Sequence, residues 1–183
     1  MANESLKTIL IKAGSLLAII WSMIHAHDGH SAELGKYSRV RTLDAIVKAA
    51  ELVEVPTALV LAVCWHEGWG LNDAKRGKAV LNKPDGATYS YGICQVKLET
   101  AQYLDARFKH RTKATPDRLK TDFVNAFYAA KYLKVQLAEY DGDWRLAIDA
   151  YNKGSNPKAN TEYVRRVMVA MERFEDFGTE LAK

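Results

Sequence analysis

The sequence predicts an all-α globular domain that follows an apolar N-terminal helix. From residue 41 onward, apolar side chains recur at helical spacing, with almost no strand-like alternation. The chain is 48% hydrophobic and 26% charged, which is typical of a globular protein and excludes a disordered or collagen-like one. Its 183 residues suffice for one domain and a short appendage. We therefore expect residues 1–35 to form the apolar helix with a polar linker, and residues 36–183 to form the helical domain.

The apolar N-terminal stretch has a charge-free part at residues 13–24, which is shorter than the roughly 20 residues of a membrane span. It is closer to the apolar region of a signal peptide, but Glu4 offsets Lys7 and no strong cleavage site follows. We expect a retained helix that docks residues 1–30 on a bilayer or on a protein of a larger assembly. A core helix of the same domain is the alternative.

A histidine-rich segment, HAHDGH, follows at residues 25–30. Histidine and aspartate can bind a metal ion, but no cysteine or further histidine lies nearby in the sequence to complete a site. We interpret the segment as a polar linker.

The first two helices of the domain lie before a long loop. Leu43, Ile46 and Ala50 mark one helical face, which predicts a helix with one buried side. Pro56 then opens a helix that is apolar nearly all round and is therefore expected in the core. Gly68 and Gly70 are expected to end it. Residues 71–90 are rich in turn formers and predict a polar loop.

Four helices are expected in the second half of the domain. One runs from about residue 93 to residue 108, and a second starts at Thr115-Pro116-Asp117 and keeps an apolar stripe to Leu137. Asp143 is the expected N-cap of a short helix that ends near Asn152. The last helix begins at Thr161, with several apolar residues on one face.

The net charge of +4 fits an anionic partner, such as nucleic acid, a cell envelope or a membrane surface, but selects none of them. Lysine and arginine form one cluster, between residues 107 and 113. We interpret this cluster as a solvated face, so no specific nucleic acid is expected. The two cysteines are too few for a disulfide scaffold or a cysteine-rich zinc module.

Glu67 is the strongest candidate for catalysis. It lies at the C-terminal end of the buried helix, between Trp65 and Trp69. Burial and the negative end of the helix dipole both favour the protonated carboxyl, which is the form that a general acid needs. Taken alone, the residue could equally be a solvated helix-terminal glutamate. His66-Glu67 does not extend to the zinc-protease pattern HExxH, because residue 70 is glycine.

Three further motifs follow Glu67 along the chain. They are Tyr91-Gly92-Ile93-Cys94-Gln95, Ala150-Tyr151-Asn152-Lys153-Gly154 and Tyr163-Val164. A glutamine amide offers both donors and an acceptor, which suits a sugar hydroxyl or an acetamido group. Each motif is common by itself, so their order and spacing carry the information.

Together with Glu67-Gly68, these motifs resemble those of the lytic transglycosylases with the soluble-lytic-transglycosylase, goose-lysozyme-like domain. That family shows Glu-Ser, Gly-Leu-Met-Gln, Ala-Tyr-Asn-Ala-Gly and Tyr-Val in the same order. The resemblance covers roughly residues 42–170. It implies a lysozyme-like helical fold, a peptidoglycan substrate, and no metal or other cofactor. Gly68, Cys94, Lys153 and Ala159 depart from the family pattern.

The resemblance also assigns roles to residues. Glu67 is the implied catalytic residue, while Gln95 and Tyr151 would position the sugar and its acetamido group, and Asn152 would fix a helix end. The implied substrate-binding residues are Gln95, Tyr151, Asn152, Cys94, Tyr91 and Tyr163. Cys64 and Cys94 would lie on the floor of one cleft, where we expect buried free thiols, with a disulfide as the alternative.

The implied reaction breaks the β-1,4 bond between N-acetylmuramic acid and N-acetylglucosamine. Glu67 protonates the bridging oxygen, and the acetamido oxygen of the sugar supports the anomeric centre. Glu67 then accepts the proton of the C6 hydroxyl, which closes a 1,6-anhydro ring. An ordinary glycosidase needs a second carboxylate, and neither Asp73, Asp85 nor Asp149 has a strong claim to that role.

Two other functions remain open from the sequence. One is a hydrolytic muramidase on the same fold, with a loop aspartate that activates water. The other is a catalytically silent structural or channel component of a virion. The small size and the Gly92-Ile93-Cys94-Gln95 motif resemble the wall-piercing enzymes of bacteriophage particles and of conjugation or secretion systems. We expect a virion component that opens the wall locally in the periplasm for DNA ejection, or a periplasmic, membrane-anchored or exported enzyme.

Overall fold

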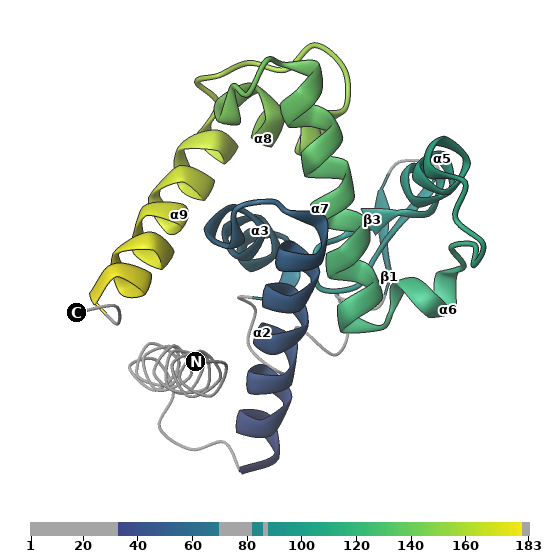
Figure 1. The fold of residues 1–183 in the computed structure, drawn as a ribbon, viewed down its shortest axis with the longest axis horizontal. Coiled ribbons are helices and arrows are strands. Elements are labelled where there is room, and N and C mark those ends of the chain that lie inside the picture. The colour runs from purple at the N-terminus through teal and green to yellow at the C-terminus, as the bar shows by residue number, and fades with distance from the viewer. Residues whose placement is uncertain (1–32, 70–81, 86–87, 181–183) are drawn as a thin grey trace, which may run out of the picture.

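The computed structural model describes residues 33–69, 82–85 and 88–180, and it is mostly helical (Figure 1). The predicted all-α class is therefore confirmed. The helices are α2 (Glu33–Val53), α3 (Thr57–Cys64), α5 (Leu98–Phe108), α6 (Pro116–Leu119), α7 (Asp122–Glu139), α8 (Trp144–Lys153) and α9 (Glu162–Glu180). A wide π-type helical turn, η1 (Trp65–Trp69), continues α3. The expected N-terminal helix and its histidines lie outside the described residues.

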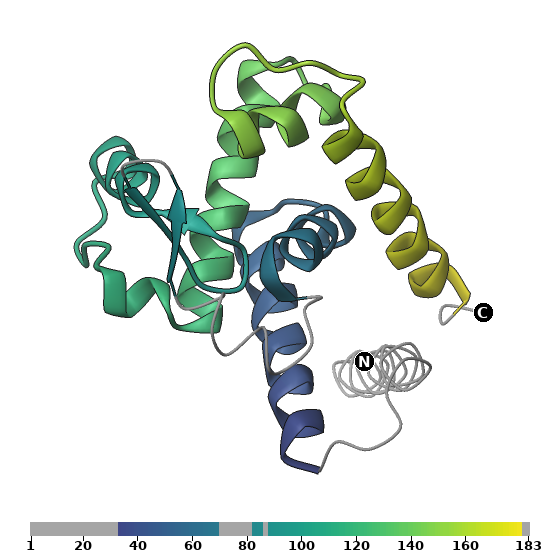
Figure 2. The same ribbon diagram turned by 180° about the vertical axis from the view of Figure 1, so that it is seen from behind.

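Helix α3 forms the centre of the core, as its apolar sequence predicts. Its residues from Leu59 to Cys64 are all buried, and it packs against α2, α7 and α9 (Figures 1 and 2). The expected face of α2 is buried too, because Leu43, Ile46 and Ala50 all lie in the core. In the part of the chain that the structure describes, no helix is both long and apolar enough to cross a membrane.

A small antiparallel sheet lies on the other side of α7, together with α5 and α6 (Figure 2). Its strands are β1 (Asn82–Asp85), β2 (Thr88–Tyr91) and β3 (Val96–Lys97), in the order β1-β2-β3. Tyr91 pairs with Asn82 on one side and with Val96 on the other.

This sheet corrects the prediction for residues 82–97. The sequence predicted a loop up to residue 90 and a helix from residue 93, whereas α5 begins only at Leu98. Strands of two and four residues are too short for an apolar alternation to be recognised. Ile93 is buried because a tight turn places it in the core, so its apolar character does not mark a helix face.

The helix starts predicted at Thr115 and Asp143 are confirmed. Thr115 Oγ1 accepts a hydrogen bond from the Arg118 amide at 3.3 Å. Asp143 Oδ1 accepts one from the Arg145 amide at 2.8 Å. The single long helix expected from Pro116 to Leu137 is divided, however, because α6 ends at Leu119 and α7 begins at Asp122.

Candidate active site

Glu67 lies on η1, and neighbouring contacts fix this turn against α9. The Trp65 ring packs edge-on against Phe174 with 6.3 Å between centroids. His66 Nε2 donates to the Arg166 carbonyl oxygen at 2.9 Å. Turns of the π type are uncommon and occur often at functional sites. The glutamate is therefore held on a wide turn between α3 and α9.

The Tyr163 hydroxyl donates a hydrogen bond of 2.6 Å to Glu67 Oε1. Burial, the charge of Glu67 and this hydrogen bond all raise the pKa of Tyr163 well above its ordinary value. Tyr163 is therefore a neutral donor at any physiological pH. It orients the carboxyl of Glu67 from the side of α9.

A disulfide between Cys64 and Cys94 links the end of α3 to the turn that carries Gln95. Both half-cystines are fully buried. The prediction of free thiols is therefore wrong, because the fold brings these two residues into direct contact. The Cys94 side chain lies in the core, so it does not face a substrate as the sequence analysis expected.

Residues 91–95 form a tight turn beside the disulfide. Gln95 has a left-handed backbone, with φ of 50°, and its Nε2 donates to the Gly92 carbonyl at 2.7 Å. The Tyr151 hydroxyl reaches this turn from α8 and donates to the Cys94 carbonyl at 2.7 Å. The second and third motifs of the sequence are thus joined directly.

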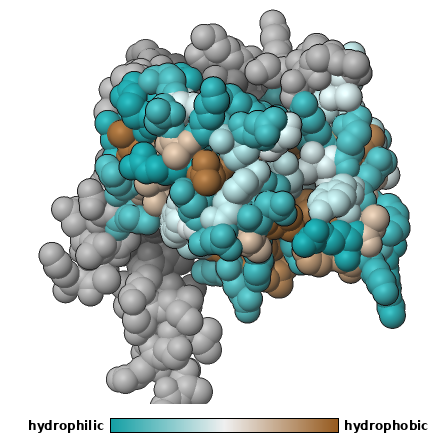
Figure 3. Space-filling view, turned by 90° about the horizontal axis from the view of Figure 1, so that it is seen from above, coloured by the Kyte–Doolittle hydropathy of each residue, from teal (hydrophilic) through white to brown (hydrophobic). Residues whose placement is uncertain are grey.

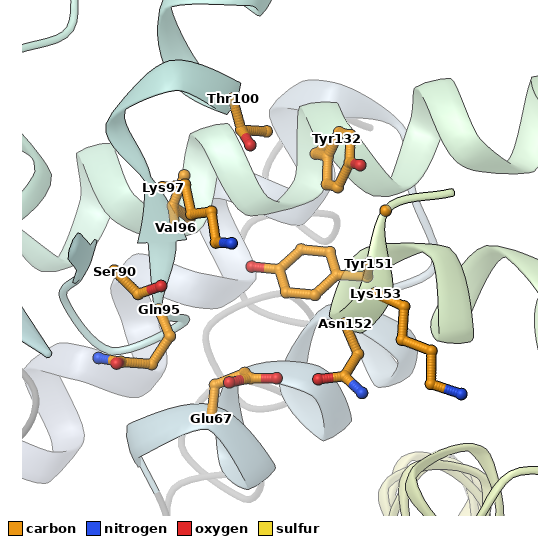
Figure 4. Close-up of a pocket in the computed structure, with 11 residues that line it drawn as sticks. Glu67, Ser90, Gln95, Val96, Lys97, Thr100, Tyr132, Tyr151, Asn152 and Lys153 are labelled. Carbon is orange, nitrogen blue, oxygen red and sulfur yellow. The ribbon is translucent and has the colours of Figure 1, made fainter. Parts of the chain in front are cut away.

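Four of the expected site residues line one pocket, namely Glu67, Gln95, Tyr151 and Asn152. Figure 4 shows Glu67 on one wall, with Gln95 and Tyr151 on the opposite side. The other lining residues are Ser90, Val96, Lys97, Thr100, Tyr132, Lys153 and Gly154. Tyr163 takes part through Glu67, whereas Tyr91, the first residue of the turn, is half-buried and is not a lining residue.

Tyr151 is a second neutral donor beside Glu67. Burial, then the charge of Glu67 and then the neighbouring Tyr132, raise the pKa of Tyr151 well above its ordinary value. The rings of Tyr151 and Tyr132 lie 5.7 Å apart between centroids. The two tyrosines therefore give the pocket an aromatic surface, which suits the apolar face of a sugar.

Asp149 is excluded as a second catalytic carboxylate. It is fully buried and accepts hydrogen bonds of 2.7 Å from the Lys158 amide and from Thr161 Oγ1. Its Oδ2 lies 3.4 Å from Lys153 Nζ. Burial alone would raise the pKa of Asp149, but these donors outweigh burial and lower it. The residue fixes the loop between α8 and α9, which sets Asn152 and Tyr163 in place.

A second groove continues the pocket between α5, α7 and the loop after α8. The two share Thr100, Tyr132 and Gly154, and the second groove adds Tyr103 and Tyr140. The face seen from above in Figure 3 is mostly hydrophilic, with hydrophobic residues in separate small groups. The pocket that holds Glu67 therefore continues into a groove lined by Tyr103, Tyr132 and Tyr140.

Sequence analysis missed Lys97, Thr100, Tyr132 and Asn125. The first three line the pocket, and Asn125 of α7 holds the 91–95 turn. The sequence did hold one indication of the role of Asn125, because it is a polar residue within the apolar part of a predicted helix. Among the described residues, no group of three or more histidine, cysteine, aspartate or glutamate side chains could hold a metal ion.

Among the described residues that line the pocket, Glu67 is the one carboxylic acid, and the Tyr163 hydroxyl orients it within a mostly helical, lysozyme-like fold. Residues 44–166 match the family model of the transglycosylase SLT domain, and the chain belongs to this family. The resemblance predicted from the four motifs is thus confirmed.

Among solved structures, the chain is similar to an inactive mutant of the lytic transglycosylase Slt from Pseudomonas aeruginosa, at 18% identity and a TM-score of 0.55. The similarity covers 76% of this chain and 24% of that enzyme, so the chain spans about a quarter of that enzyme's length. At 18% sequence identity, this structural similarity shows that the two proteins share a fold. A search of curated proteins found no match.

Proposed function

We propose that the chain is a peptidoglycan lytic transglycosylase that cleaves the β-1,4 bond after N-acetylmuramic acid and leaves 1,6-anhydro ends. One observation carries this proposal. Among the described residues that line the pocket, Glu67 is the only carboxylic acid. A single acid fits a reaction in which one group donates a proton and later accepts one, and in which the sugar's own acetamido group replaces the second carboxylate.

In the first step, the Glu67 carboxyl gives its proton to the bridging oxygen, and the bond from that oxygen to the anomeric carbon breaks. The acetamido oxygen stabilises the anomeric carbon. In the second step, the C6 hydroxyl attacks this carbon while its proton moves to the Glu67 carboxylate, so the acid is restored. Tyr163 keeps the carboxyl oriented through both steps, since its hydroxyl contacts Oε1 at 2.6 Å.

Mass spectrometry of the fragments released from purified sacculi tests this proposal. Anhydro ends are expected, whereas reducing ends would assign the chain to the hydrolytic muramidases. Glu67→Gln should lose at least a hundredfold in rate, because an amide of nearly the same shape donates no proton to the bridging oxygen. Glu51→Gln, an exposed position on α2, is the matched control and should keep full activity. Release of fragments by Glu67→Gln at the normal rate would overturn the proposal.

We further propose that the enzyme acts in the cell envelope, as a virion component that opens the wall locally for DNA ejection or as a periplasmic, membrane-anchored or exported enzyme. The Cys64–Cys94 disulfide supports this, because such bonds persist in the periplasm and on virion surfaces. The apolar run at residues 13–24 supports docking of residues 1–30 on a bilayer or on an assembly protein. Deleting residues 1–30 should abolish co-sedimentation with vesicles or particles and preserve fragment release. Unfolding of the truncated chain would instead assign the helix to the core.

A further inference from the structure

Asn125 is a fully buried amide on α7 that the proposed reaction does not use. Its Oδ1 accepts a hydrogen bond from the Cys94 amide at 2.7 Å. Its Nδ2 donates to the Tyr91 carbonyl at 2.6 Å and to the Leu119 carbonyl at 2.9 Å. The side chain therefore uses its acceptor and both amide hydrogens to hold main-chain groups of the 91–95 turn and the end of α6.

Gly92 allows the turn to pack directly against this amide. Its φ of +71° lies in the left-handed region, where a side chain is strained. A Cβ atom at this position would collide with the Asn125 side chain and with the Leu119 carbonyl. The turn and the amide thus fit each other closely, with no space for a shift toward α7.

Cys94, at the centre of this turn, is connected in three directions. Its amide donates to Asn125, its carbonyl accepts the Tyr151 hydroxyl at 2.7 Å, and its sulfur is bonded to Cys64, three residues before Glu67. The next residue, Gln95, lines the pocket. Any movement of the turn therefore displaces Gln95 and Tyr151 relative to Glu67.

We propose that Asn125 is a positioning residue for the reaction. Its carboxamide locks the 91–95 turn, so that Gln95 faces the pocket and the Cys94 carbonyl meets Tyr151. The expected loss of kcat rests on the proposed function, because the position of the turn affects the rate only if the pocket is catalytic. A misplacement of about 1 Å in an active site can cost roughly a hundredfold in rate, so a large effect on kcat is expected from a residue that touches no substrate.

The test compares Asn125→Asp and Asn125→Ala with Tyr128→Phe. Asp keeps the acceptor for the Cys94 amide but loses the donors to Tyr91 and Leu119. Tyr128, on the same helix, is also buried and donates to Asp105 at 2.6 Å, away from the pocket. Tyr128→Phe therefore loses a buried hydrogen bond without touching the turn, and it separates lost stability from lost positioning.

We expect both Asn125 variants to lose about tenfold to a hundredfold in kcat on soluble glycan strands, with KM changed less than threefold. Tyr128→Phe should keep kcat at a comparable melting temperature. Amide hydrogen exchange at Cys94 should accelerate in Asn125→Ala and stay unchanged in Tyr128→Phe. Wild-type kcat in a folded Asn125 variant, or an equal loss in Tyr128→Phe, would overturn the inference.

If neither Asn125 variant folds, Gly92→Ala disturbs the same contact from the turn side and should show the same loss of kcat. Failure of the proposed function would look different. In that case Glu67→Gln would remain as active as the wild type, while the change in Cys94 exchange would still report whether Asn125 holds the turn.

Discussion

Tyr163 and Glu67 are 96 residues apart in the sequence, yet the Tyr163 hydroxyl donates a hydrogen bond of 2.6 Å to Glu67 Oε1. The contact joins the first turn of α9 to the end of the central helix. Further along α9, the ring contact between Trp65 and Phe174 also packs this helix against η1. The C-terminal helix thus completes the surroundings of the carboxyl group.

Tyr163→Phe should lower kcat by tenfold to a hundredfold and leave the fold intact. The change removes one hydroxyl, and a hydrogen bond to a charged group is worth about 1.5–3 kcal/mol. Binding of the glycan should change little, because Tyr163 contacts Glu67 and does not line the pocket. Steady-state kinetics on soluble glycan strands and a melting curve check this. A kcat within twofold of the wild type would show that the carboxyl is oriented without Tyr163.

Tyr103→Ala should weaken the binding of long glycan strands and spare short ones. Tyr103 is 48% exposed and lines the groove that continues the pocket. Loss of one aromatic contact of about 1 kcal/mol corresponds to roughly a fivefold rise in KM. Tyr89→Ala is the matched control, since Tyr89 is 46% exposed but lines neither groove. An equal rise in KM for both variants, or for short and long strands alike, would remove the groove from the substrate path.

Replacing both cysteines by serine should destabilise the domain by about 4 kcal/mol. The bond closes a loop with a sequence separation of 30, and the loss of loop entropy in the unfolded chain scales with that length. Urea unfolding of the wild type, with and without a reductant, measures the same quantity. The reductant should have no effect on the double Cys64→Ser, Cys94→Ser variant. Equal stability of oxidised and reduced wild type would contradict this prediction.

Asp105→Asn should destabilise the domain at neutral pH and have little effect in acid. Asp105 is buried and accepts hydrogen bonds from Tyr128 at 2.6 Å, from the Ala114 amide at 2.6 Å and from His110 at 2.9 Å. Burial would raise the pKa of Asp105, but these donors outweigh burial and lower the pKa below its ordinary value. A lowered pKa means stability that is present above the unfolded value and lost as the pH falls through the folded value.

The free energy of unfolding of Asp105→Asn should therefore lie about 2–3 kcal/mol below the wild type at pH 7, and this gap should close as the pH falls below 4. Asp117→Asn, at a side chain that is 93% exposed, is the control and should show almost no gap. Urea unfolding at pH 7 and pH 3 separates the two. A gap for Asp105→Asn that is as wide at pH 3 as at pH 7 would exclude the carboxylate as its cause.

The parts of the fold that could be predicted depend on local sequence. The buried helix before Glu67 is apolar on every side, and Thr115 and Asp143 bond amides two or three residues away. The four motifs identified the family through their order along the chain, although Gly68, Cys94 and Lys153 depart from the family pattern within them. The structure then brings Glu67, Gln95, Tyr151 and Asn152 to one pocket.

The parts that could not be predicted depend on contacts between distant segments. Cys64 and Cys94 are far apart along the chain, and no local pattern distinguishes a bonded pair from two buried thiols. Asn125 meets its partners 31 and 34 residues away. The strands of the small sheet are stabilised by one another and by α5 and α7, so their own composition predicts a loop.

Asp149 anchors part of the α8–α9 loop. Some positions in this loop should therefore tolerate substitution or labelling, whereas others should not. The Lys158 main-chain amide and the Thr161 hydroxyl donate to the buried carboxylate, so loss of the Thr161 hydroxyl would weaken the start of α9, where Tyr163 lies. Ser155 and Asn156, by contrast, are exposed, and Ser155 borders the tyrosine-lined groove. A fluorophore attached at position 155 would therefore report glycan binding in real time without disturbing Glu67, the proposed catalytic residue.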